Sequence, residues 1–310
     1  MASITAPARR TTRPGAAFTE EKVSGWVSIS PWVIGFLIFT AGPIIASLYF
    51  SFTSYDVIRD PRWVGLKNYT DIFTTDRFFR KSLFNSFVYT ILYVPAHVAT
   101  ALGVALLLNQ ARQATGIFRT LFYLPSMTPA VATAILWLWI LNPNDGLVNR
   151  VLRFLHLPAP LWTIDPFWMK PSIVIMSCWS LGGAMLIFLA GLKNIPRELY
   201  EAAAIDGANA WHRFRNVTLP MLSSVTFFVA TMALISALQV FTQGYVMFDE
   251  SGGPQNAALF YIMHLFREAF RYFHMGYASA LAWLLFLVIA AMTAIQFYLS
   301  KKWVYYESDR

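Results

Sequence analysis

Charged residues divide the chain into long apolar segments. Six runs of more than 20 residues contain no Asp, Glu, Lys or Arg, namely residues 23–55, 82–111, 120–144, 171–192, 216–248 and 272–300. Because an α-helix rises about 1.5 Å per residue, each run is long enough to cross roughly 30 Å of hydrocarbon. A charge at the bilayer centre costs about 2.5 to 3.5 kcal/mol, so a helix without charges is favoured there. The pattern predicts an all-α integral membrane protein with six transmembrane helices.

The six expected helices form one transmembrane domain, residues 26–300. Residues 1–25 are expected to be a disordered cytoplasmic tail, and residues 301–310 a second cytoplasmic tail. Residues 256–274 are amphipathic and rich in aromatic side chains, which predicts a helix lying at the membrane interface. The spans are placed at about 26–53, 83–108, 118–141, 172–192, 221–243 and 277–300.

Helix-breaking residues interrupt several of these spans. Broken helices are tolerated in a membrane where the freed backbone groups face protein or a water-filled cavity, so the breaks are compatible with a transport pathway. They are expected at Pro31, Pro43, Pro95, Pro125, Pro129, Gly182 and Gly183.

A large soluble α-helical protein is the alternative to a membrane protein. Its helices would need polar stripes at a period of 3.6 residues. Residues 134–141 (AILWLWIL) and 281–291 (LAWLLFLVIAA) have no such stripe, and only 13% of the chain is charged against 57% hydrophobic. The composition therefore favours the membrane.

The net charge of +8 does not indicate nucleic acid, because the basic residues are scattered among loops and tails. If the N-terminus is cytoplasmic, slightly more of the basic residues lie on the cytoplasmic side than outside. Cytoplasmic loops of membrane proteins are usually enriched in Lys and Arg, so the count favours this orientation. Cys178 is the only cysteine and lies in the fourth span, so a disulfide or a cysteine metal site is excluded.

The most informative loop is the segment 194–220 between the fourth and fifth spans. Pro196 and Glu198 are suited to the first turn of a helix that runs to about Ile205. Gly207 can adopt the left-handed conformation that ends a helix. A second short helix, residues 209–217, then leads to the fifth span. Helices this short are marginal in water unless another surface supports them.

The composition of this segment suggests what the support is. Ala202 and Ala203 allow another surface to approach the backbone closely, while Glu201 and Asp206 carry negative charge toward a cationic partner. A helix-turn-helix that docks into a groove of another protein is one interpretation. An ordinary solvated loop is the other.

The spacing in this loop resembles the EAA signature of binding-protein-dependent ABC transporter permeases. The matching residues are Glu201-Ala202-Ala203, Gly207 and Leu219-Pro220, with Val217 where isoleucine is usual. Further stretches are similar to the sugar-importing subfamily of the maltose and glycerol-3-phosphate type: residues 65–69 (GLKNY), 119–125 (RTLFYLP) and 275–280 (MGYASA).

The resemblance implies the type I importer fold and a place in a larger complex in a bacterial or archaeal plasma (inner) membrane. Its expected partners are a second permease subunit, two ATPase subunits that bind ATP and Mg, an external solute-binding protein and membrane lipid. It also implies that a coupling helix sits in an ATPase groove. The residues implied for coupling are Glu201, Ala202, Ala203, Asp206, Gly207, Leu219 and Pro220.

The loop after the fifth span departs from the family pattern. Residues 252–254 keep the usual glycines and proline, but Asp249 and Glu250 add two acids before them. The departure leaves open how this loop contacts a solute-binding protein.

Polar and aromatic residues inside the spans are candidates for a solute pathway. Asn85, Gln239, Phe241 and Tyr245 are expected to line a sugar route, with simple helix packing as the alternative. His97 is expected to be neutral, either hydrogen-bonded or facing a cavity.

Other functional classes are less consistent with the sequence. The chain has no G-x-x-x-x-G-K-[ST] phosphate loop and no His/Glu cluster with metal-ligand spacing, so no catalytic residue, metal site or cofactor is predicted in it. An ion-coupled secondary transporter would need ionisable groups inside its spans, and the six long apolar runs are free of Asp, Glu, Lys and Arg. The resemblance makes a carbohydrate the leading solute, with glycerol-phosphate compounds as the alternative.

Overall fold

The computed structural model describes residues 14–110 and 115–305, which fold almost entirely into helices. Their one sheet is a two-stranded antiparallel ribbon of β1 (Thr53–Ser54) and β2 (Arg62–Trp63), in which Thr53 pairs with Trp63. The short helix α3 (Lys67–Thr74) follows the ribbon. The expected tails, residues 1–25 and 301–310, fall partly outside the described residues.

Three helical segments of the described chain are long and apolar enough to cross a membrane. The first combines α1 (Pro14–Phe36), the π-helical turn η1 (Leu37–Ala41) and α2 (Gly42–Ser51). The second is α4 (Arg77–Gln110), and the last is α16 (Met275–Ser300).

Three further spans are bent pairs of helices, which brings the total to six if each pair is one span. The bends measure 100° between α5 (Thr115–Met127) and α6 (Ala130–Ile140), 54° between α8 (Met169–Trp179) and α9 (Gly182–Asn194), and 66° before α13 (Ser223–Leu238). Before that last bend lie α11 (Ala210–Arg213), the π-helical turn η2 (Phe214–Thr218) and α12 (Leu219–Met221).

The breaks agree with some of the expected positions and differ at others. Pro129 caps α6 at the largest bend, and Gly182 begins α9. Pro31, Pro95 and Pro125 instead lie inside continuous helices, where neighbouring groups in a membrane protein can satisfy the freed carbonyl. A π-helical turn precedes Pro43, as one also precedes Pro220, and this widened turn accommodates a residue that lacks an N–H.

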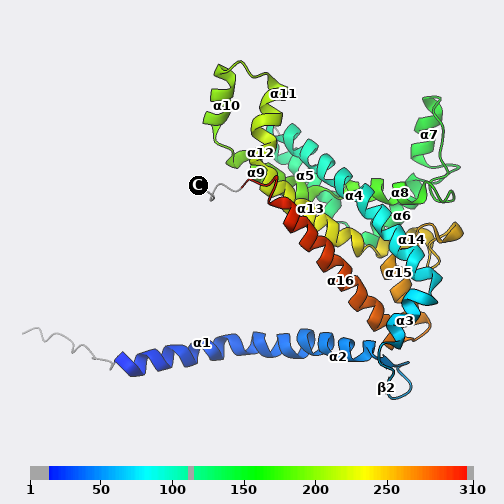
Figure 1. Ribbon diagram of the computed structural model, residues 1–310. Coiled ribbons are helices and arrows are strands. Elements are labelled where there is room, and N and C mark those ends of the chain that lie inside the picture. Colours follow the sequence, from blue (N-terminus) through cyan, green and yellow to red (C-terminus); the bar gives the residue numbers. More distant parts are fainter. Residues whose placement is uncertain (1–13, 111–114, 306–310) are drawn as a thin grey trace, which may run out of the picture.

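The first helix forms an arm that leaves the body of the protein (Figure 1). Its α2 end packs against α16, whereas the apolar stretch of α1 and η1 has no buried residue in the part of the chain that the structure describes. The helix begins at Pro14, within the segment 1–25 for which a disordered tail is expected, and that expectation stays a prediction. A helix nucleated in the membrane can extend because each added residue contributes one more hydrogen bond.

Residues 242–271 differ most from the sequence-based expectation. They form α14 (Thr242–Phe248), the 3-10 turn η3 (Pro254–Asn256), α15 (Tyr261–Phe266) and the π-helical turn η4 (Arg267–Arg271). The expected interfacial helix over 256–274 is wrong, because the non-helical residues 257–260 are fully buried and part of the main core. A segment that packs against the interior of a protein shows the same alternation of polar and apolar residues as a helix that lies on a membrane surface.

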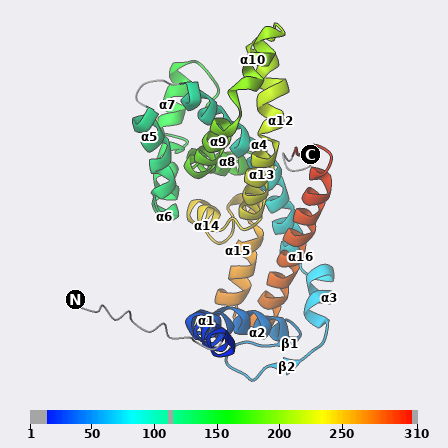
Figure 2. The same ribbon diagram turned by 90° about the vertical axis from the view of Figure 1, so that its left-hand side faces the viewer.

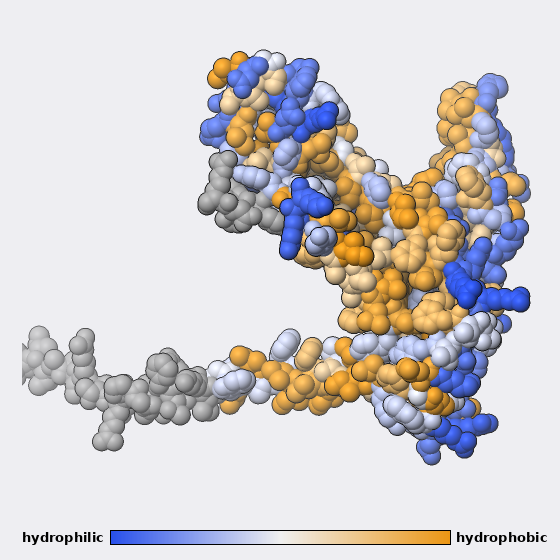
Figure 3. Space-filling model, in the orientation of Figure 1, coloured by the Kyte–Doolittle hydropathy of each residue, from blue (hydrophilic) through white to orange (hydrophobic). Residues whose placement is uncertain are grey.

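The remaining helices project from the two ends of the body (Figures 1 and 2). They are α7 (Leu147–Phe154) and α10 (Arg197–Ile205). Hydrophilic residues gather over α10 and α11 and along the right-hand edge of the molecule in Figure 3, with a largely hydrophobic surface between them. This distribution matches a protein that crosses a bilayer between the two polar ends.

Candidate functional site

The first candidate site is the elbow, residues 196–221, which contains α10, α11, η2 and α12. Helix α10 has nine residues, and none of them is buried. Figure 2 shows α10 and α12 extending beyond the ends of the spans. Because so short a helix gains little stability alone, it needs a surface outside the described chain to hold it.

The turn of the elbow is built by Gly207, as predicted. Its φ is +79°, in the left-handed region, and its N–H donates to the carbonyl of Ala204 at 3.1 Å. The N–H of Ala208 donates to the carbonyl of Ala203 at 2.9 Å, which completes the usual end of a helix at a glycine. Asn209 then caps α11, its side-chain oxygen accepting the N–H of His212 at 2.9 Å.

One side-chain contact links α10 to the foot of the fifth span. The hydroxyls of Tyr200 in α10 and Thr218 in η2 lie 3.0 Å apart. Leu219 and Pro220 follow directly in α12, before the 66° bend into α13. The elbow is therefore joined to a membrane helix through a kink, and Tyr200 is part of this link.

The exposed surface of the elbow combines acids with two large apolar side chains. Glu201 and Asp206 are exposed, as the sequence predicts for a charged loop. Ile205 is 87% exposed and Trp211 is 63% exposed. Sequence reasoning missed both as candidates, although an isoleucine and a tryptophan inside a charged loop between spans are a usable signal.

The second candidate site is a cavity of about 410 Å³ where three helix breaks meet. It lies against the breaks between α5 and α6, between α8 and α9, and between α13 and α14. The volume is within the range of roughly 300 to 1,000 Å³ typical of small-molecule sites. Broken helices at membrane depth are expected around such a cavity, because it gives their free backbone groups polar surroundings.

The lining of this cavity is polar and uncharged. Thr133 is 7% exposed, and its hydroxyl has no hydrogen-bond partner among the described residues. Hydroxyl and amide side chains dominate the wall, and no Asp, Glu, Lys, Arg or His is among its described lining residues. The hydroxyl and amide residues are Ser126, Thr128, Thr133, Ser177, Ser180, Ser236, Gln239, Thr242 and Gln243.

Two tyrosines of α4 supply aromatic surface to the same cavity. The rings of Tyr89 and Tyr93 stack 5.4 Å apart, and the Tyr89 hydroxyl donates to Ser177 at 3.0 Å. The ring of His97 lies 5.0 Å from Tyr93 but does not line the cavity. A polar stripe runs along one face of α4, where polar residues recur every four positions at Asn85, Tyr89, Tyr93 and His97. This stripe is the sequence signal by which the two tyrosines could have been predicted as lining residues.

The residues predicted for the pathway are only partly brought together. Gln239 and Phe241 line the cavity. The ring of Tyr245 lies 5.3 Å from that of Phe241, but Tyr245 borders a separate hollow with Asp249 and Glu250. Asn85 is only 1% exposed and lies outside the cavity lining.

Asn85 instead holds the buried segment 256–261. Its amide donates to the carbonyls of Asn256 at 2.9 Å and Leu259 at 3.0 Å. Lys170 of α8 donates to the side-chain oxygen of Asn85 at 3.2 Å and to the carbonyl of Ala257 at 2.6 Å. These bonds satisfy backbone groups that a helix would otherwise satisfy, so Asn85 and Lys170 position the segment beside the cavity.

Comparison with known proteins identifies the family. Residues 97–305 match the family described as binding-protein-dependent transport system inner membrane component. The probable ABC transporter permease protein YesP of Bacillus subtilis is 45% identical over 93% of this chain and 94% of its own length. The lactose transport system permease protein LacF of Rhizobium radiobacter is 32% identical over 90% of this chain and 95% of its own.

A solved structure supports the same fold. The crystal structure of a bacterial ABC transporter involved in the import of the acidic polysaccharide alginate has a TM-score of 0.80 at 21% identity, covering 94% of this chain and 99% of that chain. The six predicted spans and the expected importer-permease fold agree with this match. The chain belongs to the family of inner-membrane permease components of binding-protein-dependent ABC transporters, which are transport subunits and not enzymes.

Proposed function

We propose that this chain forms half of the translocation pathway of an ATP-driven importer for a carbohydrate. The observation that carries the proposal is the combination of a projecting, unsupported elbow with an uncharged polar cavity at the helix breaks. In the proposed complex, this chain pairs with a second permease subunit, two ATPase subunits bind ATP and Mg, and a solute-binding protein delivers the cargo outside.

The elbow is proposed to dock into a groove of an ATPase subunit. Ile205 and Trp211 supply the apolar anchors, and burying such a side chain contributes roughly 1.5 to 3 kcal/mol. Glu201 and Asp206 flank the anchors and pair with cations on the partner. The proposed coupling segment therefore has two further parts. The two anchors make the apolar contact, and the shape of the elbow is set by Ala202, Ala203, Gly207, Leu219 and Pro220.

Docking fixes the orientation of the chain. An ATPase works in the cytoplasm, so the elbow lies on that side. Tyr305, near the C-terminus, lies beside the elbow, and its N–H donates to Ser223 at 2.9 Å. With six spans, the N-terminus lies on the same side.

The cavity supports a neutral, hydroxyl-rich cargo. Ser, Thr, Gln and Tyr side chains can exchange hydrogen bonds with sugar hydroxyls. A glycerol-phosphate compound would favour a cation in the wall, and the described lining residues include none. Carbohydrate is therefore the favoured solute class.

The coupling role is tested by copurification. Glu201→Lys, made in the complete complex, is expected to lower the amount of ATPase subunit that copurifies with this chain at least several-fold. Asp60→Lys is the matched control, because Asp60 is also an exposed acid but lies between β1 and β2, far from the elbow in the fold. Equal recovery of the ATPase subunit in both variants would contradict docking through the elbow.

The solute class is tested on the solute-binding protein that works with this permease. A thermal-shift screen against neutral oligosaccharides, acidic oligosaccharides and glycerol phosphodiesters is expected to give its largest stabilisation with a neutral sugar. Stabilisation by phosphodiesters alone would overturn the carbohydrate assignment and leave the coupling role intact.

A further inference from the structure

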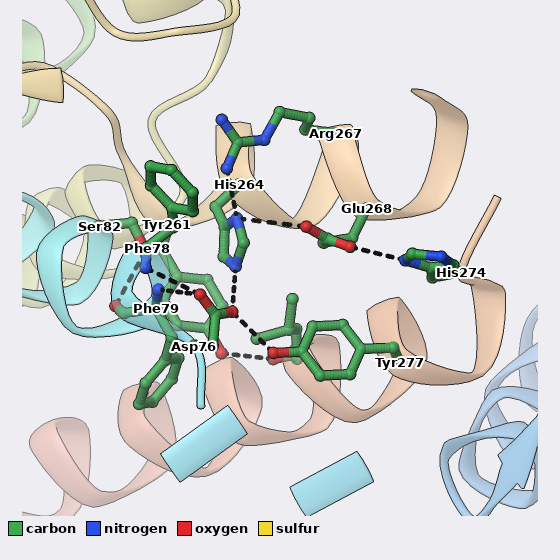
Figure 4. Close-up of polar contacts among 11 residues, drawn as sticks. Asp76, Phe78, Phe79, Ser82, Tyr261, His264, Arg267, Glu268, His274 and Tyr277 are labelled. Atoms are coloured by element: carbon green, nitrogen blue, oxygen red, sulfur yellow. Dashed lines mark hydrogen bonds and ion pairs between the residues drawn. The ribbon is translucent and has the colours of Figure 1, made fainter. Parts of the chain in front are cut away.

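A buried polar cluster (Figure 4) joins α4, α15 and α16 at the end of the spans that lies away from α10 and α11 in Figure 1. The Asp76 Oδ2 atom accepts a hydrogen bond from His264 Nε2 at 2.6 Å and one from the Tyr277 hydroxyl at 2.7 Å. Asp76 precedes α4, His264 lies in α15 and Tyr277 lies in the first turn of α16. One carboxylate thus joins three elements that are far apart in the sequence.

Asp76 is itself fixed by the backbone of α4. Its Oδ1 atom accepts the N–H groups of Phe78 at 2.8 Å and Phe79 at 3.0 Å, which caps the helix. Burial by itself raises the pKa of Asp76. The hydrogen bonds from His264 and Tyr277 outweigh this effect and lower the pKa to about 2. The group is therefore ionised at any physiological pH and acts as an acceptor for both partners.

Charged groups surround the ring of His264. Its Nδ1 atom lies 3.4 Å from Arg267 Nη2. Glu268 faces the same Nδ1 at 3.9 Å and binds His274 Nδ1 at 3.0 Å through its other oxygen. His264 is 1% exposed, so this arrangement is held inside the protein.

Packing around the cluster joins the same elements a second time. The Tyr261 hydroxyl donates to the carbonyl of Leu281 in α16 at 2.8 Å, and its N–H donates to Ser86 of α4 at 3.0 Å. An apolar core of Ile72, Phe79, Tyr261, Ala280, Leu281 and Leu285 lies beside the polar bonds.

Helix α6 reaches the cavity in a different way. It follows a bend of 100° at Pro129 and supplies Ala130 and Thr133 to the cavity lining. Of the three elements that Asp76 joins, α4 also lines the cavity, through Tyr89 and Tyr93. The cavity therefore lies between a helix that the polar cluster ties at one end and a helix that follows a bend.

We propose that Asp76, His264 and Tyr277 form a brace that makes the ends of α4, α15–η4 and α16 move as one body. When the cavity opens toward the side away from the elbow, α6 swings against this body, and the three braced ends do not separate. The proposal rests on the proposed function for one point only, that ATP drives the opening.

The motion is tested with pairs of spin labels in the complete transporter, in a Cys178→Ala background. The first pair is Lys81 and Phe273, two exposed positions within the braced body. The second pair is Lys81, on α4, and the exposed Asp145, which follows α6. Electron–electron distances are compared without nucleotide and with ATP plus vanadate. The Lys81–Asp145 distance is expected to change by several ångströms while the Lys81–Phe273 distance does not. A change in Lys81–Phe273 as large as that in Lys81–Asp145 overturns the proposal.

The brace itself is tested without nucleotide. Tyr277→Phe removes one hydroxyl and keeps the ring, so it avoids the folding defect that loss of Asp76 could cause. It is expected to broaden the Lys81–Phe273 distance distribution. Tyr298→Phe is the matched control, because Tyr298 lies on the same helix but is largely exposed. An unchanged, narrow distribution in Tyr277→Phe refutes the brace, whether or not ATP moves the other pair.

The two tests separate failure of the brace from failure of the proposed function. If neither distance responds to ATP plus vanadate, the proposed coupling to ATP is wrong, and the Tyr277→Phe comparison still decides the brace.

Discussion

The hydroxyls of Tyr200 and Thr218 meet at 3.0 Å and join the projecting helix α10 to the foot of the fifth span. Thr218 is buried, and its hydroxyl also lies 3.5 Å from the carbonyl of Arg213. This hydrogen bond is one of the links, with the turn at Gly207 and the apolar packing of Tyr200, through which a force on α10 reaches the membrane helix.

Tyr200→Phe should therefore weaken coupling without removing the docking surface. Loss of one hydrogen bond costs roughly 0.5 to 1.5 kcal/mol. We expect the ratio of solute transported to ATP hydrolysed to fall, and amide hydrogen exchange in α10 to accelerate. Tyr305→Phe, an exposed tyrosine beside the elbow, serves as the control. A coupling ratio equal to that of the control would show that the link is dispensable.

Gly207→Ala should destabilise the elbow because φ is +79° there. A side chain in the left-handed region costs roughly 1 to 2 kcal/mol. Less ATPase subunit should copurify with the variant, while its yield in the membrane stays normal. Gly183→Ala is the control: Gly183 lies in α9 with open space at its Cβ, and alanine there should be neutral or slightly stabilising. Normal copurification of Gly207→Ala would contradict the role of the turn.

Asn85→Ala should destabilise the fold near the cavity. It removes the side-chain donor from the carbonyls of Asn256 and Leu259. The Asn256 carbonyl keeps the N–H of Leu259 at 3.2 Å, whereas the buried carbonyl of Leu259 loses the Asn85 amide, and an unsatisfied buried group costs about 1 to 3 kcal/mol. The apparent melting temperature in detergent should fall by several degrees. Asn216→Ala, at an exposed position in η2, should leave it unchanged. Similar melting of the two variants would mean that the segment 256–261 is held by other contacts.

Thr133→Val should weaken solute passage and not stability. The change keeps the shape of a side chain that lines the cavity and removes its hydroxyl, which is buried without a partner in the described chain. Loss of one hydrogen bond to the solute predicts a rise in transport KM of roughly two- to tenfold. Thr100→Val, at an exposed position on α4, is the control. An unchanged KM would place the solute elsewhere.

Because of Asp76, the free energy of unfolding is expected to depend on pH in the acidic range. Its pKa is lowered from 3.8 to about 2 in the folded protein, so its contribution is fully present above pH 4 and is lost as the pH falls through 2. The shift corresponds to about 2 kcal/mol at neutral pH. Asp76→Asn should melt well below the unmodified protein at pH 6, and the gap should narrow as the pH approaches 2. A gap that is constant with pH would contradict this assignment.

Local features of the fold could be predicted from the sequence. Charge-free runs gave the spans, and the order Pro196, Glu198, Gly207 gave the bounds and the turn of α10. Each of these depends on residues that are close together in the chain, where helix propensity and the cost of burying charge act directly.

Features that depend on distant partners could not be predicted. Asn85 looked like a pathway residue because a polar side chain in a span needs a partner, but its partners are carbonyls near residue 257. The segment 256–274 looked like an interfacial helix because the pattern does not distinguish a buried protein wall from a membrane surface. Ile205 and Trp211 stand out in the sequence as large apolar residues in a charged loop, but the extent of their exposure depends on the fold.

The arm formed by α1, η1 and α2 has a consequence for the biogenesis of the protein. A membrane helix that touches its own chain only near one end gains little from folding there, and its apolar stretch is left to lipid or to a neighbouring subunit. In a newly inserted copy, the first helix would stay without stable packing until the other subunits of the transporter assemble with it. Cells that make it without them should degrade it faster, so its half-life should report on the assembly of the whole transporter.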